Sequence, residues 1–371
     1  MKLYYVPIIL ISLFVSSLHA VSIENYTIQQ KAMGGVSVAT FTQLSQFQSN
    51  PAKLALIEGV DIDLLHLNVG FNKELISNLS KLSDIQSETD ESRQIEMLKD
   101  LTPLKLGGKV RLTPLVSFTK QNMGFSHFTN GQISGALKRK SAPGLELTGG
   151  TESNFAFGYA RPIKINNRVV LLGVSPKYVS KKIIYDKVSG EDTIEWTQSE
   201  LLRMINGIDE ADVDLYSLSG FGIDTGLLIP FDNKKATGMM GLTIKNLVSS
   251  LSGTKDLTNS SSEIKTRDPL IAVLGTSFET QLPVLNKTTL AADYNLIDDN
   301  GSFFKRLHLG AEKKVSVLEF RGGVNQGYIV GGLGLNLKIF TLNYAFFGEE
   351  LGNDLGETPL LTHNIHLGFS F

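Results

Sequence analysis

Apolar and polar side chains alternate in short runs along most of this chain, and that alternation restricts its fold more than any other feature. In one clear run, Phe155, Phe157 and Tyr159 alternate with small or polar residues, as a strand with one apolar face requires. Fourteen runs of this kind occur, at residues 60–71, 108–119, 132–140, 154–160, 168–181, 212–231, 236–247, 269–281, 287–297, 304–313, 316–325, 328–337, 338–347 and 362–371. The pattern predicts an all-β protein.

Alternation alone does not separate a soluble sandwich from a membrane barrel, but the connections between the runs favour the barrel. In a transmembrane barrel, short periplasmic turns alternate with longer external loops. Long polar connections lie at 72–107, 182–211, 248–268 and 348–361, and short ones at 162–167, 232–235, 282–286 and 313–314. Two connections depart from this order, because 120–131 is long for a periplasmic turn and 325–327 is short for an external loop. We therefore expect a transmembrane antiparallel β-barrel of about 14 strands over residues 57–371.

The first twenty residues have the features of a cleaved signal peptide. Lys2 supplies a positive charge, residues 5–18 are mostly apolar, and Ala20 is a small residue at a plausible cleavage point. The apolar stretch is shorter than the ~20 residues that a spanning helix needs, and no second stretch of that length follows. We expect residues 1–20 to be removed on export. A buried N-terminal helix is the alternative interpretation.

The last strand has the form of an assembly signal. Ile365, Leu367, Phe369 and Phe371 alternate with His366 and smaller residues, and the chain stops on an aromatic residue. This ending resembles the signal read by the outer-membrane barrel assembly machinery, with Phe369 and Phe371 as its aromatic positions. The expected location is the outer membrane of a Gram-negative cell, with outer-membrane lipid and that machinery as partners.

Composition excludes several other classes of protein. The chain has 35 Lys and Arg residues against 37 Asp and Glu, so its net charge of −2 argues against binding to a nucleic-acid backbone. Charged residues make up 19%, below the roughly 25% of an ordinary soluble domain. Cysteine is absent, which rules out disulfides, thiolate metal sites, iron–sulfur clusters and cysteine nucleophiles. The protein is expected to have a surface poor in charge and to need no cofactor.

Residues 21–56 differ from the alternating runs that follow them. Paired Gly34 and Gly35 permit positive φ and close approach of the backbone, while Pro51 fixes φ and lacks a donor, so the segment is suited to tight turns. Asn50 and Ala52 flank this proline directly before the first strand. Such a segment can fold inside a barrel, although an ordinary loop leading into the first strand is the alternative.

The order of these motifs resembles a known family of barrels. The segments AMGGVSVAT (32–40) and SNPAKLAL (49–56) are similar to the N-terminal hatch of the FadL-type fatty-acid transporter superfamily. Four further segments are similar to its TraF-like conjugal-transfer branch: GFGIDTGLLIPF (220–231), MGLTIKNL (240–247), LAADYNL (290–296) and RLHLGAEKKV (306–315). The resemblance implies that residues 21–56 form a hatch within the lumen, with Gly34, Gly35, Asn50, Pro51 and Ala52 as its characteristic positions.

Two helices are predicted inside external connections. Leucine and isoleucine recur at helical spacing between residues 74 and 101, among acidic residues and lysines. A second helix is expected from Thr197 to Gly207, where Glu200 completes a capping box with Thr197. These helices are expected either to form a lid or docking surface over the pore, or to pack on themselves as decoration of the loops.

Catalytic and metal-binding arrangements are weak. His363 and His366 have the spacing H-x-x-H, but residues three apart on a strand face opposite sides and cannot share a metal. The glycines of 220–226 lack the spacing of a dinucleotide-binding loop, and no nucleophile elbow is present. A Ser, His and Asn triad assembled from distant strands would leave no local motif. We expect no enzyme and no metal site.

A set of charges is expected to face the lumen, because each lies opposite the apolar face of its strand. These residues are Arg111, Asp224, Lys245, Asp293, Glu312, Glu319 and Arg321. Charges removed from bulk water need partners, so they either pair and fill the lumen or flank a passage. Met33, Val36, Val38 and Phe41 are the apolar candidates for a pocket beside the hatch.

Two functions remain. One is a channel that admits small hydrophobic compounds, similar to fatty acids. The other is a barrel that transports nothing and serves a conjugation or secretion assembly through contacts with its proteins.

Overall fold

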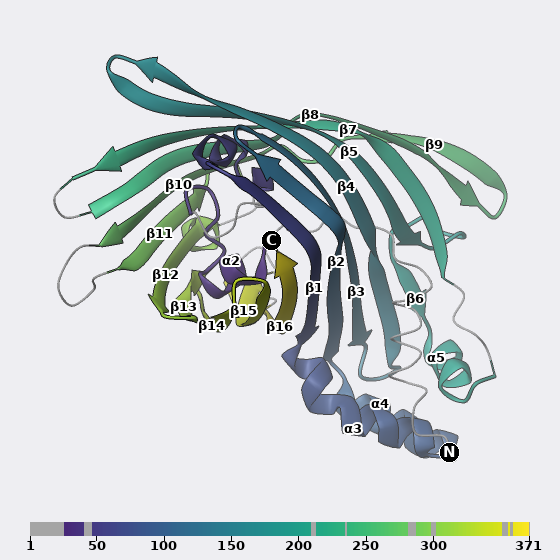
Figure 1. Ribbon diagram of the computed structural model, residues 1–371. Coiled ribbons are helices and arrows are strands. Elements are labelled where there is room, and N and C mark those ends of the chain that lie inside the picture. Colours follow the sequence, from purple (N-terminus) through teal and green to yellow (C-terminus); the bar gives the residue numbers. More distant parts are fainter. Residues whose placement is uncertain are drawn as a thin grey trace.

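The chain forms one closed antiparallel barrel in a computed structural model that describes residues 26–40, 47–208, 213–233, 236–280, 287–297, 302–350, 355–356 and 359–370. Its wall strands are β1 (Val60–Asn72), β2 (Leu104–Lys120), β3 (Met123–Lys138), β4 (Gly144–Ile165), β5 (Arg168–Tyr185), β7 (Asp214–Asp232), β8 (Ala236–Leu257), β10 (Ile271–Thr280), β11 (Thr288–Asn295), β12 (Leu307–Val315), β13 (Leu318–Asn325), β14 (Tyr328–Asn336), β15 (Phe340–Glu350) and β16 (Pro359–Ser370). Each pairs with the wall strand before and after it, β8 pairs with β10, and β16 pairs with β1 (Figure 1).

The other elements lie within the connections or before the first strand. Two short strands pair outside the closed ring, β6 (Ile194–Trp196) with β4 and β9 (Ser260–Thr266) with β8. The helices are α2 (Ile28–Ala32), α3 (Lys73–Ser87), α4 (Glu91–Leu101) and α5 (Gln198–Ile205), with 3-10 turns η2 (Pro51–Leu56) and η3 (Phe303–Arg306). The predicted barrel of fourteen strands is confirmed, since each predicted run overlaps one wall strand. Both predicted helical regions are confirmed as α3 with α4 and as α5.

The apolar face of the strands points outward. Phe155, Phe157 and Tyr159 are 42%, 46% and 45% exposed, and Phe369 near the end of β16 is 41% exposed. In a soluble sandwich these aromatic side chains would lie between two sheets. Their exposure around a closed ring is what contact with lipid requires.

Of the two connections that departed from the expected order, the prediction of a long connection at 120–131 was wrong and that of a short one at 325–327 is confirmed. The connection between β2 and β3 is only 121–122, because Met123, Phe125 and His127 already alternate outward as the start of β3. The turn between β13 and β14 has two residues, Gln326 and Gly327, with φ of 51° and 85°. Positive φ at both positions is typical of a two-residue hairpin turn.

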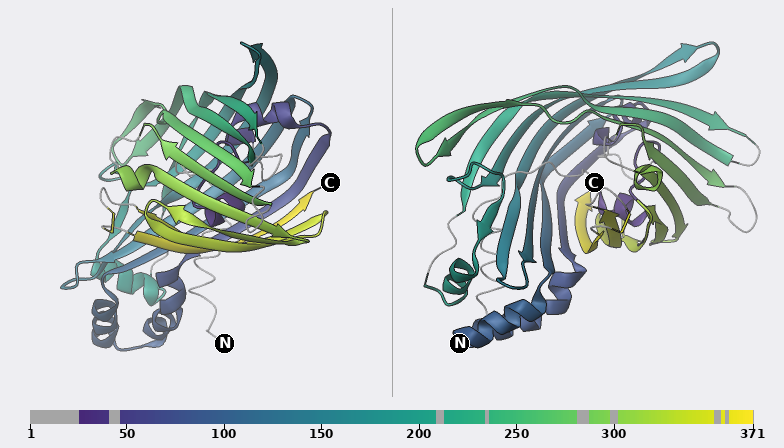
Figure 2. Two further views of the ribbon diagram at one scale, coloured as in Figure 1. Left: turned by 90° about the vertical axis from the view of Figure 1, so that its left-hand side faces the viewer. Right: turned by 180° about the vertical axis from the view of Figure 1, so that it is seen from behind.

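The wall has very unequal height. Strands β4 and β8 each have 22 residues, whereas β11 and β13 each have 8. At ~3.3 Å per residue and a tilt of about 40°, these strands rise by roughly 55 Å and 20 Å along the barrel axis. An apolar belt about 25 Å tall would cover the short strands completely. The long strands therefore extend well beyond a belt of this height. Figure 2 shows the tall blue and teal side of the barrel from two further directions.

The helical insertions cover the outer face of this high wall. Leu104 of β2 pairs with Leu137 of β3, which pairs with Leu145 of β4 on the same face as Phe155. Leu104 and Leu137 are buried in a cluster with side chains of the three helices, which are Ile85 of α3, Leu98 and Leu101 of α4, and Leu201 and Leu202 of α5. The helices thus stabilise the wall from outside. Within the described ranges, no helix combines the length and hydrophobicity needed to cross a bilayer.

We name the two ends of the barrel by their connections. The short-turn end carries the connections 121–122, 166–167 and 316–317, and the long-loop end carries 73–103 and 186–213. Helices α3, α4 and α5 all lie toward the long-loop end (Figure 1).

Candidate functional site

The described part of the predicted hatch lies inside the barrel, and we call residues 26–40 and 47–56 the N-terminal segment. Every residue from 28 to 40 is buried, and helix α2 lies within the ring of strands (Figure 1). Thr27 caps α2, accepting from the backbone of Gln30, whose side chain accepts from the backbone of Thr27. Residues 21–25 and 41–46 are outside the described residues, as are the predicted signal peptide and Phe41.

Gly34 and Gly35 bring the N-terminal segment directly against the wall. Both have positive φ, 74° and 85°. A Cβ on Gly34 would lie 2.2 Å from the carbonyl oxygen of Leu309, and one on Gly35 would lie 2.9 Å from Nδ1 of His308. Glycine is therefore required at Gly34 both by its conformation and by the lack of space.

Asn50, Pro51 and Ala52 fasten the other half of the segment. Asn50 Nδ2 donates to the carbonyl oxygens of Val38 at 3.2 Å and Leu227 at 3.4 Å, while its Oδ1 accepts from the backbone N–H of Ala52 at 3.0 Å. The amide thus joins two stretches of the segment to β7. Pro51 begins η2, where a missing N–H costs nothing.

Wall glycines provide the space in which these motifs lie. A Cβ on Gly173 of β5 would lie 2.3 Å from the backbone nitrogen of Ala52, and one on Gly226 of β7 would lie 1.9 Å from Oδ1 of Asn50. A Cβ on Gly310 of β12 would lie 2.3 Å from the carbonyl oxygen of Met33. The strand glycines therefore mark the path of the N-terminal segment along the inner wall.

Two buried charged side chains, those of Asp293 and Lys53, bind the backbone of the N-terminal segment at Ser37. Asp293 of β11 accepts from the backbone N–H groups of Ser37 at 2.6 Å and Val38 at 3.0 Å. Lys53 Nζ donates to the carbonyl oxygen of Ser37 at 2.6 Å and to Ser49 Oγ at 2.9 Å. Burial lowers the pKa of Lys53 from 10.5 to about 7, against the opposing effect of the Asp293 carboxylate, and the positive charge of Lys245 lowers it further.

Three of the predicted lumen charges form one cluster. Arg321 of β13 contacts Glu312 of β12 at 2.6 Å and also pairs with Glu319. Lys314 lies 3.5 Å from both carboxylates. All three predicted residues are buried, so the cluster satisfies its own charges within the lumen wall.

The remaining predicted charges do not join that cluster. Asp224 pairs with Lys177 of β5 at 2.8 Å, and Lys245 is half-buried near Lys53. The side chain of Arg111 lies outside the described residues.

A second ion network was missed from the sequence. Lys181 of β5 lies 3.2 Å from Glu152 of β4 and 2.5 Å from Asp268. Lys177 and Lys181 occupy the same face of β5, opposite exposed Tyr178, so the alternation of that strand would have found them.

The lumen contains a large chamber at the short-turn end. Its volume is about 990 Å³, and Leu56 from the end of η2 forms part of its lining. Register places Met239 beside Pro230 on the inner face, and Thr237 beside Asp232. Thr289, Glu312 and Lys314 extend the lining on β11 and β12, so apolar and charged side chains both face this space.

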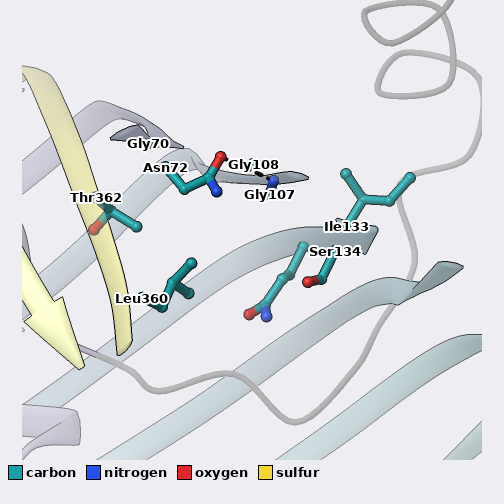
Figure 3. Close-up of a pocket in the computed structure, with 9 residues that line it drawn as sticks. Gly70, Asn72, Gly107, Gly108, Ile133, Ser134, Leu360 and Thr362 are labelled. Carbon is teal, nitrogen blue, oxygen red and sulfur yellow. Dashed lines mark hydrogen bonds between the residues drawn. The ribbon is translucent and has the colours of Figure 1, made fainter. Parts of the chain in front are cut away.

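A much smaller cavity lies at the long-loop end, where α3 begins. It has a volume of about 10 Å³ between Gly70, Asn72, Gly107, Ser134 and Leu360 (Figure 3), which is room for about one water molecule. Asn72 is buried here, donating to the carbonyl oxygen of Lys105 at 2.7 Å and accepting from the N–H groups of Leu75 and Gly107. This side chain ties the first helical insertion to β2.

The histidines lie in different environments. His363 faces outward and contacts Tyr344 Oη at 2.7 Å, whereas His366 is buried and contacts His66 across the β1–β16 pair. His308 Nδ1 lies 3.0 Å from the carbonyl oxygen of Gly34. Among the residues that the structure describes, no three His, Asp or Glu side chains converge as metal ligands.

The predicted pocket and assembly residues can also be located. Met33, Val36 and Val38 are completely buried against the wall and do not line the chamber. Phe369 lies on the outer face with its ring 5.4 Å from that of Phe340, and Phe371 is outside the described residues. Their role in assembly remains a prediction.

Several solved barrels are similar to this chain. The Ralstonia pickettii toluene transporter TbuX is 13% identical, with 93% of this chain and 97% of that chain covered and a TM-score of 0.47. The P. putida toluene transporter TodX is 12% identical, with coverage of 94% and 99% and a TM-score of 0.48. The transport unit of the Escherichia coli autotransporter AIDA-I is 9% identical, with coverage of 85% and 91% and a TM-score of 0.36.

Sequence comparison gives the family. A search of curated proteins finds no match. The model of the family described as "F plasmid transfer operon, TraF, protein" matches residues 71–296, more than half of the 371 residues. The chain therefore belongs to this TraF family, as the order of its short motifs indicated.

Proposed function

We propose that this protein is an outer-membrane channel through which small hydrophobic compounds pass. The observation that carries the proposal is the open-mouthed chamber of about 990 Å³ at the short-turn end of the lumen. That volume is at the upper end of the range in which proteins hold small ligands, about 300–1,000 Å³. Leu56 forms part of its lining, so a movement of the N-terminal segment would alter the space directly.

The exposed outer face supports a location in the outer membrane. A ring of outward aromatic and aliphatic side chains suits lipid, and barrels are the strand structures that leave no unpaired edge within a bilayer. With short turns on the periplasmic side, the chamber would open to the periplasm and α3, α4 and α5 would lie outside the cell.

Uptake by cells tests the proposal. Cells with the protein should take up a labelled fatty acid or labelled toluene faster than cells without it. Met239→Trp should reduce that uptake because the larger side chain fills the chamber, whereas Met240→Trp should not, because Met240 is the next residue and is 53% exposed on the outer face. Equal uptake with and without the protein, for both compounds, would end the channel proposal.

The second candidate is a barrel that serves a conjugation or secretion assembly without transport. The observation in its favour is the fixed position of the helical insertions, because Gln94 of α4 and Asn206 after α5 exchange side-chain hydrogen bonds of 2.9 and 3.2 Å. Such a surface suits docking better than a moving lid, and the family description names a transfer operon.

A charge placed on this surface tests the second candidate. Ile76 and Leu79 of α3 are 47% and 44% exposed. Substitution of both by Asp should lower plasmid transfer between cells if the helix binds a transfer protein, while Val188→Asp in another external connection should not. Unchanged transfer with Ile76→Asp and Leu79→Asp would argue against docking through α3.

A further inference from the structure

A row of five buried side chains joins four strands on the inner wall, β13, β15, β16 and β1. Arg321 Nη1 donates to Asn343 Oδ1 at 2.9 Å, and Asn343 Nδ2 lies 3.0 Å from His366 Nδ1. His366 Nε2 lies 2.8 Å from His66 Nδ1, and His66 Nε2 lies 3.1 Å from Asp63 Oδ1. The two imidazole rings are stacked, with centroids 4.9 Å apart. We call these five residues the histidine row.

The chemistry of the groups fixes the direction of each contact. Arginine only donates, so the oxygen of Asn343 must face Arg321 and its amide nitrogen must face His366. His366 therefore accepts at Nδ1 and carries its proton at Nε2, which donates to Nδ1 of His66. The proton of His66 is left on Nε2, directed toward the Asp63 carboxylate.

In this arrangement both unprotonated imidazole nitrogens already accept a hydrogen bond. His66 Nδ1 receives a proton from His366, and His366 Nδ1 receives one from Asn343. An additional proton from solvent can bind only at one of these two nitrogens, so it must break one of the two contacts. Binding at His366 Nδ1 would also require the Asn343 amide to turn its nitrogen toward Arg321, which has no acceptor.

The histidine row lies next to the attachment of helix α2. Lys31 Nζ donates to Asn364 Oδ1 at 3.2 Å, and Asn364 is two residues from His366 on the same face of β16. Lys31 also lies 5.2 Å from the centre of the Phe347 ring on β15. Ala32 of α2 packs on Ala345, two residues from Asn343. A positive charge gained at His366 would therefore appear roughly 7 Å along the strand from the residue that holds Lys31.

We propose that the histidine row is a proton-binding site whose occupation releases helix α2 from the wall. With both imidazoles neutral, the row holds β15 and β16 in the positions that α2 contacts. Proton uptake breaks one contact within the row and adds a cation close to Lys31 and Arg321. Both effects weaken the contacts of α2 with β15 and β16, so the N-terminal segment loosens in acid.

Charged groups around the row either favour or oppose binding of the added proton. Asp61 and Asp63 on β1 favour the added proton, as do Glu319 on β13 and Glu312 on β12, while Arg321, Lys31 and the more distant Lys314 oppose it. On β2, Ser117 and Thr119 pair with Asp63 and Asp61 and carry no charge, and the side chains of 109–116 are outside the described residues.

Hydrogen exchange of the full-length protein in detergent tests the inference. At about pH 5 and about pH 7.5, on either side of the range in which histidine changes charge, exchange of the amides of residues 28–40 is measured and corrected for the intrinsic effect of pH. We expect the corrected exchange to be about tenfold faster at the lower pH, as for a local opening, with the strands unaffected. Equal corrected exchange at both pH values would overturn the proposal.

Variants assign the response to the row. His366→Gln keeps a side chain that forms hydrogen bonds but cannot take up a proton, so it should abolish the pH response. His363→Gln removes the histidine three residues away on the outer face and should keep it. Heat-modifiable mobility on a gel shows that each variant is folded, and His66→Gln replaces His366→Gln if the latter does not fold. A response that survives in both row variants would contradict the assignment. Because exchange requires no solute, this test is independent of the proposed passage.

Discussion

At the scale of single residues, the absence of a side chain is as informative as its presence. Gly173 and Gly226 leave space that Ala52 and Asn50 occupy, so the hatch motif and the strand glycines are two halves of one contact. The hatch motif was identified from the sequence but its partners in the wall were not, because Gly173 lies 121 positions after Ala52 and Gly226 lies 176 positions after Asn50. Only the closed barrel brings them together.

Gly173→Ala should displace the N-terminal segment. Its new methyl group would lie 2.3 Å from the backbone nitrogen of Ala52, and overpacking of this kind costs about 1–3 kcal/mol. Limited proteolysis and hydrogen exchange of residues 47–56 measure the effect. Gly331→Ala is the matched control, because the nearest atom to its Cβ is 3.5 Å away. If both variants behave as the unaltered protein, the close contact at Gly173 is wrong.

Lys53 should make stability depend on pH. Its pKa in the folded protein is about 7, below the ordinary value of 10.5, so the folded state binds fewer protons than the unfolded state between these values. Stability should rise as the pH increases from about 7 to about 10.5, by at most about 1.4 kcal/mol per pH unit, and be independent of this group below about 7. Lys53→Met should remove that rise.

Urea unfolding in detergent micelles over this pH range measures the dependence. Lys287→Met is the control, because Lys287 is exposed at the short-turn end. A rise of the same slope in Lys53→Met as in the unaltered protein would show that another group is responsible.

At the scale of elements, the strands were predictable in position and less so in length. β4 was expected at 154–160 but extends over Gly144–Ile165, because Thr148 to Ser153 are small or polar on both faces and show no alternation. A stretch of this kind has no periodic pattern that predicts a strand. The helices were predictable from their spacing and the Thr197 capping box, but not their place on the outer wall.

Leu202→Ala should loosen the helical insertions without opening the barrel. Leu202 is 3% exposed between α5 and the outer wall, and truncation of a buried leucine costs about 2–5 kcal/mol. Hydrogen exchange within α4 and α5 should increase, while that of β11 to β14 should not change. Leu79→Ala, at a leucine that is 44% exposed, should have little effect. Unaltered exchange in Leu202→Ala would indicate that the helices do not depend on this cluster.

At the scale of the whole molecule, alternation and connection length were enough to predict a closed barrel of fourteen strands. The buried ion pairs were only partly predictable. His66 and His366 are 300 residues apart on the strands that close the ring, and nothing local fixes the register of that pair. The alternation along each strand predicted which face a charged residue lies on. Its partner, however, depends on the register between strands and on bulges, such as the one between Asp63 and Leu65.

Removal of the terminal aromatic should reduce assembly of the barrel. Phe371→Ser takes away the residue that the assembly machinery is expected to recognise, so less protein should show heat-modifiable mobility in the Sarkosyl-insoluble envelope. Phe304→Ser, at a phenylalanine 61% exposed in an external connection, should assemble as usual. A normal yield of folded Phe371→Ser would contradict the proposed signal, and a fully soluble unaltered protein would contradict the membrane location.

The unequal height of the wall has a consequence for approach to the barrel. With the long-loop end outside the cell, as proposed, the long strands β4 to β8 would project further from the lipid than the short strands β11 to β14. In this orientation the opening at the cell surface would be tilted toward the side of the short strands. A molecule in the outer leaflet would then reach this opening from the side of the short strands, whereas on the other side it would first contact the long strands.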